Sequence, residues 1–179
     1  LTIATNLQKF ASERLKGMSA SSVLIDIKSG DILSLVSTPS YNPNNFVLGI
    51  SQSDWSALLN DERKPLLNKA TSGAYPPGST FKMVVAAAAL ELGLIGLNDK
   101  IFCAGFYELG SRKFHCWLKG GHGKLTLQEA IQKSCDVYFY ELARKVGVKR
   151  IGDMARRLGL GQAYNLPLTG LSKGFVPTK

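Results

Sequence analysis

The sequence predicts an α+β fold, layered in the α/β manner, in which helices flank an antiparallel sheet. Residues 5–16 carry apolar side chains at the spacing of an amphipathic helix. Two apolar runs, residues 22–27 and 32–37, surround a glycine-containing turn and predict a β-hairpin whose first strand is buried. An alanine-rich run over residues 83–92 is apolar on all sides, which is typical of a buried helix.

The remaining elements follow from caps and helix breakers. Residues 40–46 have the composition of a loop, and Ser53 is expected to cap a short helix that ends at Leu59. The glycine-rich residues 101–124 are expected to be irregular. Three further helices are predicted, over residues 126–133 (with Thr126 and Glu129 as a capping box), 137–147 and 149–158.

Composition narrows the class of protein. The 179 residues suffice for a domain with a real core, and no apolar run is long enough to span a membrane. The net charge is +9, but the basic residues are scattered and carry no RNA-binding signature, so nucleic acid is not an expected partner. The chain starts in a strand-like segment and ends without a closing element, and we expect it to be a piece of a longer protein.

The segment from Tyr75 to Lys82 reads Tyr-Pro-Pro-Gly-Ser-Thr-Phe-Lys and leads into the alanine-rich helix. Ser79 and Lys82 are three residues apart at the helix start, so their side chains share one face. A serine hydroxyl needs an adjacent base to become a nucleophile, and a lysine with a lowered pKa can be that base. A simple helix cap beside a solvated lysine is the alternative interpretation.

A second polar pair, Ser134 and Asp136, interrupts the predicted helices. Two polar side chains that are two residues apart in a tight turn can point to the same side. Such a serine can relay a proton to a leaving group, while the carboxylate orients the lysine or the substrate. Helix capping explains the same pattern equally well.

Together these motifs resemble the first two of the three motifs of the penicilloyl-serine transferases. The likeness extends to Ser40-Tyr41-Asn42-Pro43-Asn44, Gly120-Gly121-His122-Gly123 and Asp136-Val137-Tyr138-Phe139-Tyr140, and it runs over nearly the whole chain. The chain is thus similar to the transpeptidase domain of the class B penicillin-binding proteins, in the elongation-specific penicillin-binding protein 2 group. The third motif, Lys-Thr/Ser-Gly, is absent.

The resemblance implies a penicillin-binding-protein/β-lactamase-like fold and a peptidoglycan D,D-transpeptidase. Ser79 would attack the D-alanine carbonyl of a stem peptide, and Lys82 would take its proton. Ser134 would pass the proton to the departing D-alanine, and Asp136 would hold the lysine or the substrate. β-Lactams would acylate Ser79, whose backbone N–H would be one oxyanion-hole donor.

By the same resemblance, residues 1–179 form a partial transpeptidase domain, truncated before the last strands and lacking the third motif and an N-terminal membrane anchor. The parent would be anchored at the periplasmic face of the bacterial inner membrane, with a membrane glycosyltransferase and a scaffold of the elongation complex as partners. A serine β-lactamase or D,D-carboxypeptidase, and a non-catalytic penicillin-sensing domain, remain alternative functions.

The three cysteines lie in one stretch with a histidine, in the order Cys103, Cys116, His122 and Cys135. Three thiolates and an imidazole are a standard tetrahedral set for structural zinc. His122 suits the set better than His115, which neighbours Cys116 and would face the opposite way in an extended segment. A Cys103–Cys116 disulfide and three plain buried thiols are the alternatives. The resemblance implies zinc, because a bound zinc is known in the group.

Overall fold

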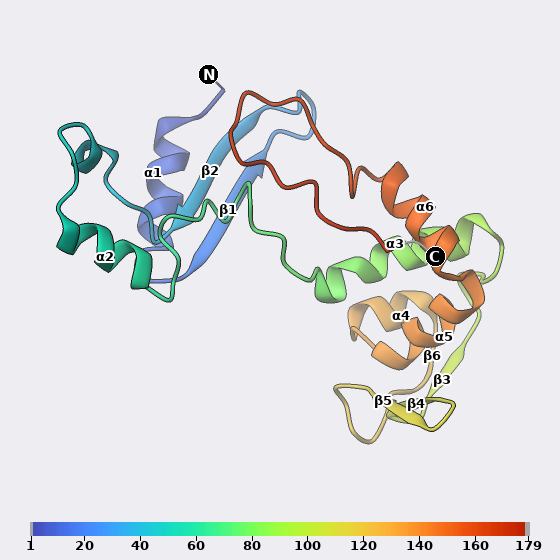
Figure 1. Ribbon diagram of the computed structural model, residues 1–179. Coiled ribbons are helices and arrows are strands. Elements are labelled where there is room, and N and C mark those ends of the chain that lie inside the picture. Colours follow the sequence, from blue (N-terminus) through green and yellow to red (C-terminus); the bar gives the residue numbers. More distant parts are fainter. Residues whose placement is uncertain (1, 178–179) are drawn as a thin grey trace. The chain divides into compact units, whose positions relative to one another are not determined.

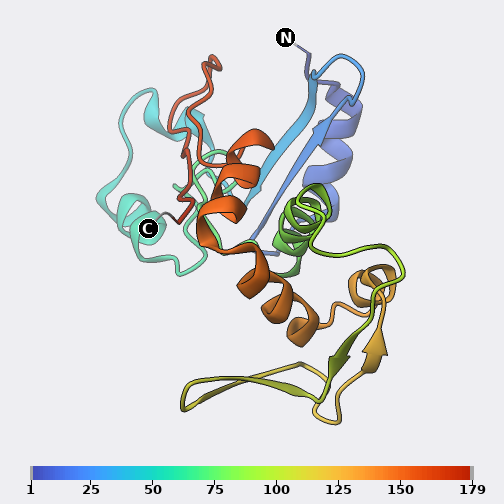
Figure 2. The same cartoon turned by 90° about the vertical axis from the view of Figure 1, so that its right-hand side faces the viewer.

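The computed structural model describes residues 2–177, which form two compact units (Figures 1 and 2). Within the described residues, one unit comprises residues 2–74 with 163–172, and the other comprises residues 75–162 with 173–177. Helices and short antiparallel strand pairs occur together, so the α+β class is confirmed. None of the helices in the described part is long and apolar enough to cross a membrane.

The first unit is built on a helix and a hairpin. Helix α1 (Thr5–Arg14) precedes strands β1 (Ala20–Ile25) and β2 (Ile32–Thr38), which pair antiparallel with Val23 opposite Leu35. The side chain of Gln8 on α1 donates to the Leu35 carbonyl and accepts from the Leu35 N–H, both at 2.8 Å. Its amide thus satisfies the backbone of β2 as a neighbouring strand would.

Two predictions for this unit are wrong in detail. Strand β1 is largely exposed rather than buried, and Val23, Leu24 and Ile25 are at least 44% exposed. A short turn of 3-10 helix, η1 (Pro43–Phe46), and helix α2 (Gln52–Asn60) follow the hairpin. The cap of α2 is Ser51 instead of Ser53, since its hydroxyl accepts from the Asp54 N–H.

The second unit begins with η2 (Gly78–Phe81), a 3-10 turn that continues into helix α3 (Lys82–Glu91). Residues 101–124 were expected to be irregular, but this prediction is wrong, because the segment after α3 contains four short strands. These are β3 (Ile101–Cys103), β4 (Phe106–Leu109), β5 (Arg112–His115) and β6 (Gly123–Leu125). Strand β3 pairs antiparallel with β6, and β4 with β5, so the sheets of the described chain are all two-stranded.

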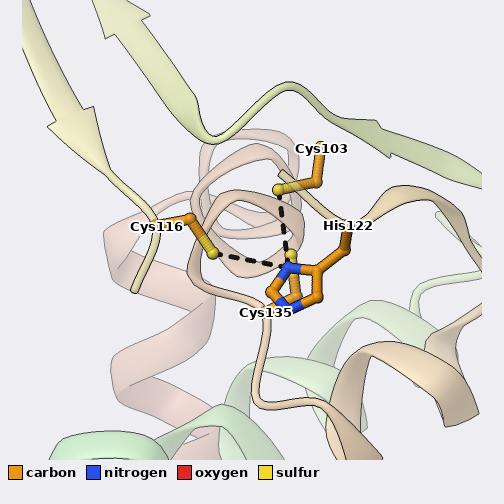
Figure 3. Close-up of side chains that lie close together, drawn as sticks. All are labelled: Cys103, Cys116, His122 and Cys135. Atoms are coloured by element: carbon orange, nitrogen blue, oxygen red, sulfur yellow. Dashed lines mark hydrogen bonds between the residues drawn. The ribbon is translucent and has the colours of Figure 1, made fainter. Parts of the chain in front are cut away.

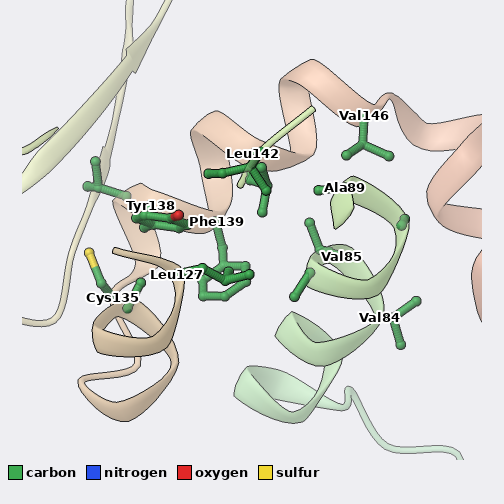
Figure 4. Packing of buried hydrophobic residues seen from close by; sticks show 14 of the residues in the cluster. Val84, Val85, Ala89, Leu127, Cys135, Tyr138, Phe139, Leu142 and Val146 are labelled. Carbon is green, nitrogen blue, oxygen red and sulfur yellow. The ribbon is translucent and has the colours of Figure 1, made fainter. Parts of the chain in front are cut away.

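Three helices complete this unit: α4 (Leu127–Gln132), α5 (Asp136–Val146) and α6 (Val148–Arg157). The predicted capping box is confirmed, since Thr126 and Glu129 exchange hydrogen bonds at the start of α4. Figure 4 shows α3 packed against α5, with apolar side chains of both helices between them. The side chains in this core that are buried fully or almost fully include Val85, Ala89, Leu127, Tyr138 and Leu142. This core fixes the starts of α3 and α5 near each other.

Replacement of Leu142 tests this core. Leu142 is 0% exposed, so Leu142→Ala should leave a cavity and lower the free energy of unfolding by about 2–5 kcal/mol. Leu158→Ala is the matched control, because Leu158 is 57% exposed and its loss should cost less than about 0.5 kcal/mol. Denaturant titration measures both values, and equal effects would show that the α3–α5 core does not determine stability.

Candidate active site and metal centre

The site begins at the turn that precedes α3. Gly78 has φ +56°, and no atom lies near the position that a Cβ atom would take. Glycine is therefore favoured here by the backbone conformation and not by steric crowding. Ser79 lies inside η2, and the N-cap positions of η2 and α3 are Pro77 and Phe81. The interpretation of Ser79 as a mere helix cap is therefore wrong. Lys82 is the first residue of α3, one turn after Ser79.

The structure brings Ser79, Lys82, Ser134 and Asp136 together. The Ser134 hydroxyl donates to the Ser79 hydroxyl at 2.7 Å. Lys82 Nζ donates to the Ser134 hydroxyl at 3.0 Å, to the Ser134 carbonyl at 2.7 Å and to Asp136 Oδ1 at 2.7 Å. Among the described residues, Ser79 is thus joined to Lys82 through Ser134, in a chain of three polar side chains.

The lysine end of this chain is sheltered. The side chain of Lys82 is 14% exposed and that of Asp136 is 25% exposed. The ring of Phe139, which is buried in α5, lies 5.7 Å from Lys82 Nζ and provides a cation–π contact. Partial burial strengthens the attraction between the ammonium group and the carboxylate, because less water screens it.

The turn between α4 and α5 positions the other two groups. Ser134 has φ +48°, an uncommon conformation for a residue with a side chain. The Ser134 N–H donates to the Ile131 carbonyl and the Cys135 N–H to the Ala130 carbonyl, which closes the end of α4. Ser134 and Asp136 consequently face Lys82, whereas Cys135 is 0% exposed and belongs to a second cluster.

The second cluster is the predicted metal set (Figure 3). One ligand atom from each of Cys103, Cys116, His122 and Cys135 lies within 4.8 Å of all the others. His122 Nδ1 is 3.5 Å from Cys116 Sγ and 3.7 Å from Cys103 Sγ. Ligands at zinc distances in a tetrahedron are separated by roughly 3.5–3.8 Å, so the two distances from His122 Nδ1 to sulfur fit a zinc ion. All three thiols are free, and a Cys103–Cys116 disulfide is not formed.

Backbone contact explains how residues from different elements meet in this cluster. A Cβ atom on Gly121 would lie 2.3 Å from the Cys103 carbonyl oxygen, so only glycine allows this approach. The close packing of Gly121 on Cys103 places the adjacent His122 beside the Cys103 sulfur. His122 Nε2 is buried without a hydrogen-bond partner in the described part of the chain.

The cysteine thiols differ in acidity because their surroundings differ. Burial raises the pKa of Cys116, but backbone hydrogen bonds around Leu118, Asp136 and Val137 outweigh this effect, and the pKa is lowered. Burial, together with the neighbouring thiols of Cys103 and Cys116, raises the pKa of Cys135 to about 12, although the backbone N–H of Tyr138 opposes the rise. A metal cation would favour the thiolate at every cysteine, as zinc ligands are deprotonated.

Two residues near the site were missed by the sequence analysis. Trp117 donates its backbone N–H to Asp136 Oδ2 at 3.0 Å and its indole N–H to the Lys133 carbonyl at 3.0 Å. Phe139 lies beside Lys82 as described above. The position of Trp117 directly after a candidate metal ligand was the available signal for the first. No pattern in the sequence indicated that Phe139 faces the lysine.

A hollow adjoins this arrangement on the Ser134 side. Its volume is about 590 Å³, and it is lined by Trp117, Leu118, Gly121, His122, Gln132, Lys133 and Ser134. The hydroxyl of Ser79 is exposed and bonded to Ser134, so a substrate seated at the hollow would have its reacting carbonyl near two serines. The geometry suits acyl transfer to a serine.

Comparisons with known proteins agree with this chemistry. Residues 20–179 match the family of the penicillin binding protein transpeptidase domain. Over its whole length the chain is 42% identical to the peptidoglycan D,D-transpeptidase MrdA of Escherichia coli K12, and it spans 29% of that relative.

Solved structures are similar as well. Pseudomonas aeruginosa PBP2 in complex with WCK 5153 matches with a TM-score of 0.93 and 39% identity, over 99% of this chain and 41% of that chain. Helicobacter pylori PBP2, in its complex with MreC, matches with a TM-score of 0.92 and 36% identity, over 98% of this chain and 33% of that chain. The chain therefore belongs to the penicillin-binding protein transpeptidase family, and its likeness to the penicillin-binding protein 2 group is confirmed.

Proposed function

We propose that the chain is the nucleophile-bearing part of a peptidoglycan D,D-transpeptidase. The observation that carries this proposal is the continuous chain of contacts from the Ser79 hydroxyl through Ser134 to Lys82 and Asp136. The 42% identity to a D,D-transpeptidase supports it. The substrates would be peptidoglycan stem peptides, and β-lactam antibiotics would acylate the same serine.

In the proposed acylation, Ser79 Oγ attacks the carbonyl carbon of the donor stem peptide. For this step Lys82 must be the neutral amine, and the two hydroxyl groups must turn from the arrangement in the structure so that Ser79 donates to Ser134 and Ser134 donates to Lys82 Nζ. The Ser79 proton then passes to Ser134 as the Ser134 proton passes to Lys82. The chain of contacts then works in reverse, and Ser134 delivers a proton to the departing D-alanine amine. Asp136 keeps the lysine in place throughout and stabilises its charged form.

A second stem-peptide amine would resolve the ester and form the cross-link. A β-lactamase or D,D-carboxypeptidase would instead admit water to the ester, and a penicillin-sensing domain would stop at the adduct. The likeness to MrdA and PBP2 proteins favours the transpeptidase. We place the parent protein at the periplasmic face of the inner membrane, because its substrates are assembled there.

We further propose that the parent works with partners of the elongation complex. The solved complex of Helicobacter pylori PBP2 with MreC supports a scaffold partner. A membrane glycosyltransferase is the other expected partner, because newly polymerised strands are the substrate for cross-linking. Both proposals concern the complete protein, because the chain matches only 29% of the length of MrdA.

Zinc is the proposed structural metal of the Cys103, Cys116, His122 and Cys135 cluster. A bound zinc ion would supply a rigid cross-link between segments that contain few residues of regular structure. The four side chains come from β3, the end of β5, the loop before β6 and the start of α5. Cys135 lies between Ser134 and Asp136, so its anchoring would hold the turn on which both depend.

Replacement of the nucleophile tests the proposed reaction. The complete gene product that carries this sequence is incubated with benzylpenicillin, and its intact mass is measured. The unaltered protein should gain one penicilloyl group, whereas Ser79→Ala should gain none, because the acyl bond needs the Ser79 oxygen. Thr80→Ala is the matched control and should still be acylated. An adduct of undiminished yield on Ser79→Ala would refute the assignment of the nucleophile.

Metal removal tests the second cluster. Elemental analysis should find about one zinc per chain, the content of one four-ligand site. A chelator should release it and lower the melting temperature, since metal binding contributes to folding. His122→Ala should reduce the zinc content, whereas His115→Ala should not, because His115 lies outside the cluster. Protein purified without chelators that contains no metal would contradict the proposal.

A further inference from the structure

We infer that Trp117 is a positioning residue for acylation, which holds the turn that carries Ser134. This inference rests on the proposed acyl transfer to Ser79. Trp117 is hydrogen-bonded to one residue before Ser134 and to one after it, and it makes no hydrogen bond to Ser79 or Lys82 in the described structure. Its two hydrogen bonds lead to the Lys133 carbonyl and to the carboxylate of Asp136.

The first bond satisfies a group that a helix end leaves free. The last carbonyls of a helix have no partner within the helix. Lys133 is the C-cap of α4, and its carbonyl accepts from the Trp117 indole N–H at 3.0 Å. The next residue is Ser134, which has left-handed backbone angles, with φ +48°. Such a conformation persists when neighbouring contacts determine it, and the indole provides one directly before the strained residue.

The second bond acts on the other side of the turn. The carboxylate of Asp136 accepts from Lys82 Nζ through Oδ1 and from the Trp117 N–H through Oδ2. With both oxygens engaged, rotation of the carboxylate away from Lys82 would break both bonds at once. Trp117 thus orients the carboxylate that fixes the lysine.

The surroundings of Trp117 connect it to the proposed metal cluster. It directly follows Cys116 of the proposed metal cluster, and its ring lies edge-on to that of His122, with 5.2 Å between centroids. Trp117 is nevertheless 63% exposed, and it lines the hollow beside Ser134. Trp117 could therefore position the turn that carries Ser134 through its indole N–H, or bind the substrate through its indole surface. The two hydrogen bonds favour positioning.

Two substitutions separate these roles. Trp117→Phe keeps an aromatic surface but removes the indole N–H. Trp117→His loses most of that surface, but its Nε2 can occupy the place of the indole nitrogen and donate to the Lys133 carbonyl. Trp55→Phe in α2 is the matched control, since it makes the same change at the other tryptophan of the chain.

The complete gene product and its variants are reacted with benzylpenicillin, and the acylation rate constant is measured separately from the dissociation constant of the initial complex. For Trp117→Phe we expect an acylation rate constant that is roughly 3- to 10-fold lower, because one neutral hydrogen bond is lost. The dissociation constant of the initial complex should be unchanged. Trp117→His should recover most of the rate, and Trp55→Phe should equal the unaltered protein.

Three results would overturn the inference. The first is an unchanged acylation rate constant in Trp117→Phe. The second is a higher dissociation constant of the initial complex in both Trp117 variants with no change in the acylation rate constant. The third is a loss of bound metal that accounts for the slower acylation. If the unaltered protein is not acylated at all, the proposed function fails, and the role of Trp117 in acylation fails with it. The measurement on the unaltered protein therefore distinguishes the two failures.

Discussion

The ion pair between Lys82 and Asp136 is the interaction on which the rest of the site depends. It joins the first residue of α3 to the first residue of α5, at 2.7 Å and with little exposure to water. The apolar contacts between the two helices bring these ends together, and the ion pair then determines which groups face each other. Ser134 is placed next to Lys82 as a consequence, and it reaches Ser79.

The turn from Ser134 to Asp136 has two faces with different chemistry. Ser134 and Asp136 face the lysine, and Cys135 faces the three other candidate metal ligands. Successive side chains along this short segment point to alternate sides, so the same turn can contribute to the serine–lysine site and to the cysteine cluster. The core of α5 and the indole of Trp117 therefore act on the same few backbone atoms, and the proposed metal would act on them too, which accounts for a serine with φ +48° at this turn.

Local chemistry in the sequence predicted most of the site, and long-range contact determined the rest. Ser79 and Lys82 were found because a helix start imposes a fixed spacing, and the cysteine set because its residue types suit one metal. The strands between Ile101 and Leu125 were missed because each spans only three or four residues and glycines surround them. Trp117 was missed because its partners are 16 and 19 residues away, which no periodicity reveals.

A double-mutant cycle on Lys82 and Asp136 tests the central role of their ion pair most directly. The free energy of unfolding is measured for the unaltered protein, Lys82→Met, Asp136→Asn and the double variant. Each single change leaves a partly buried group without its partner, so the two losses should not add, and the coupling should be at least about 1 kcal/mol. Additive losses, with coupling near zero, would show that the two helix starts are held together without this ion pair.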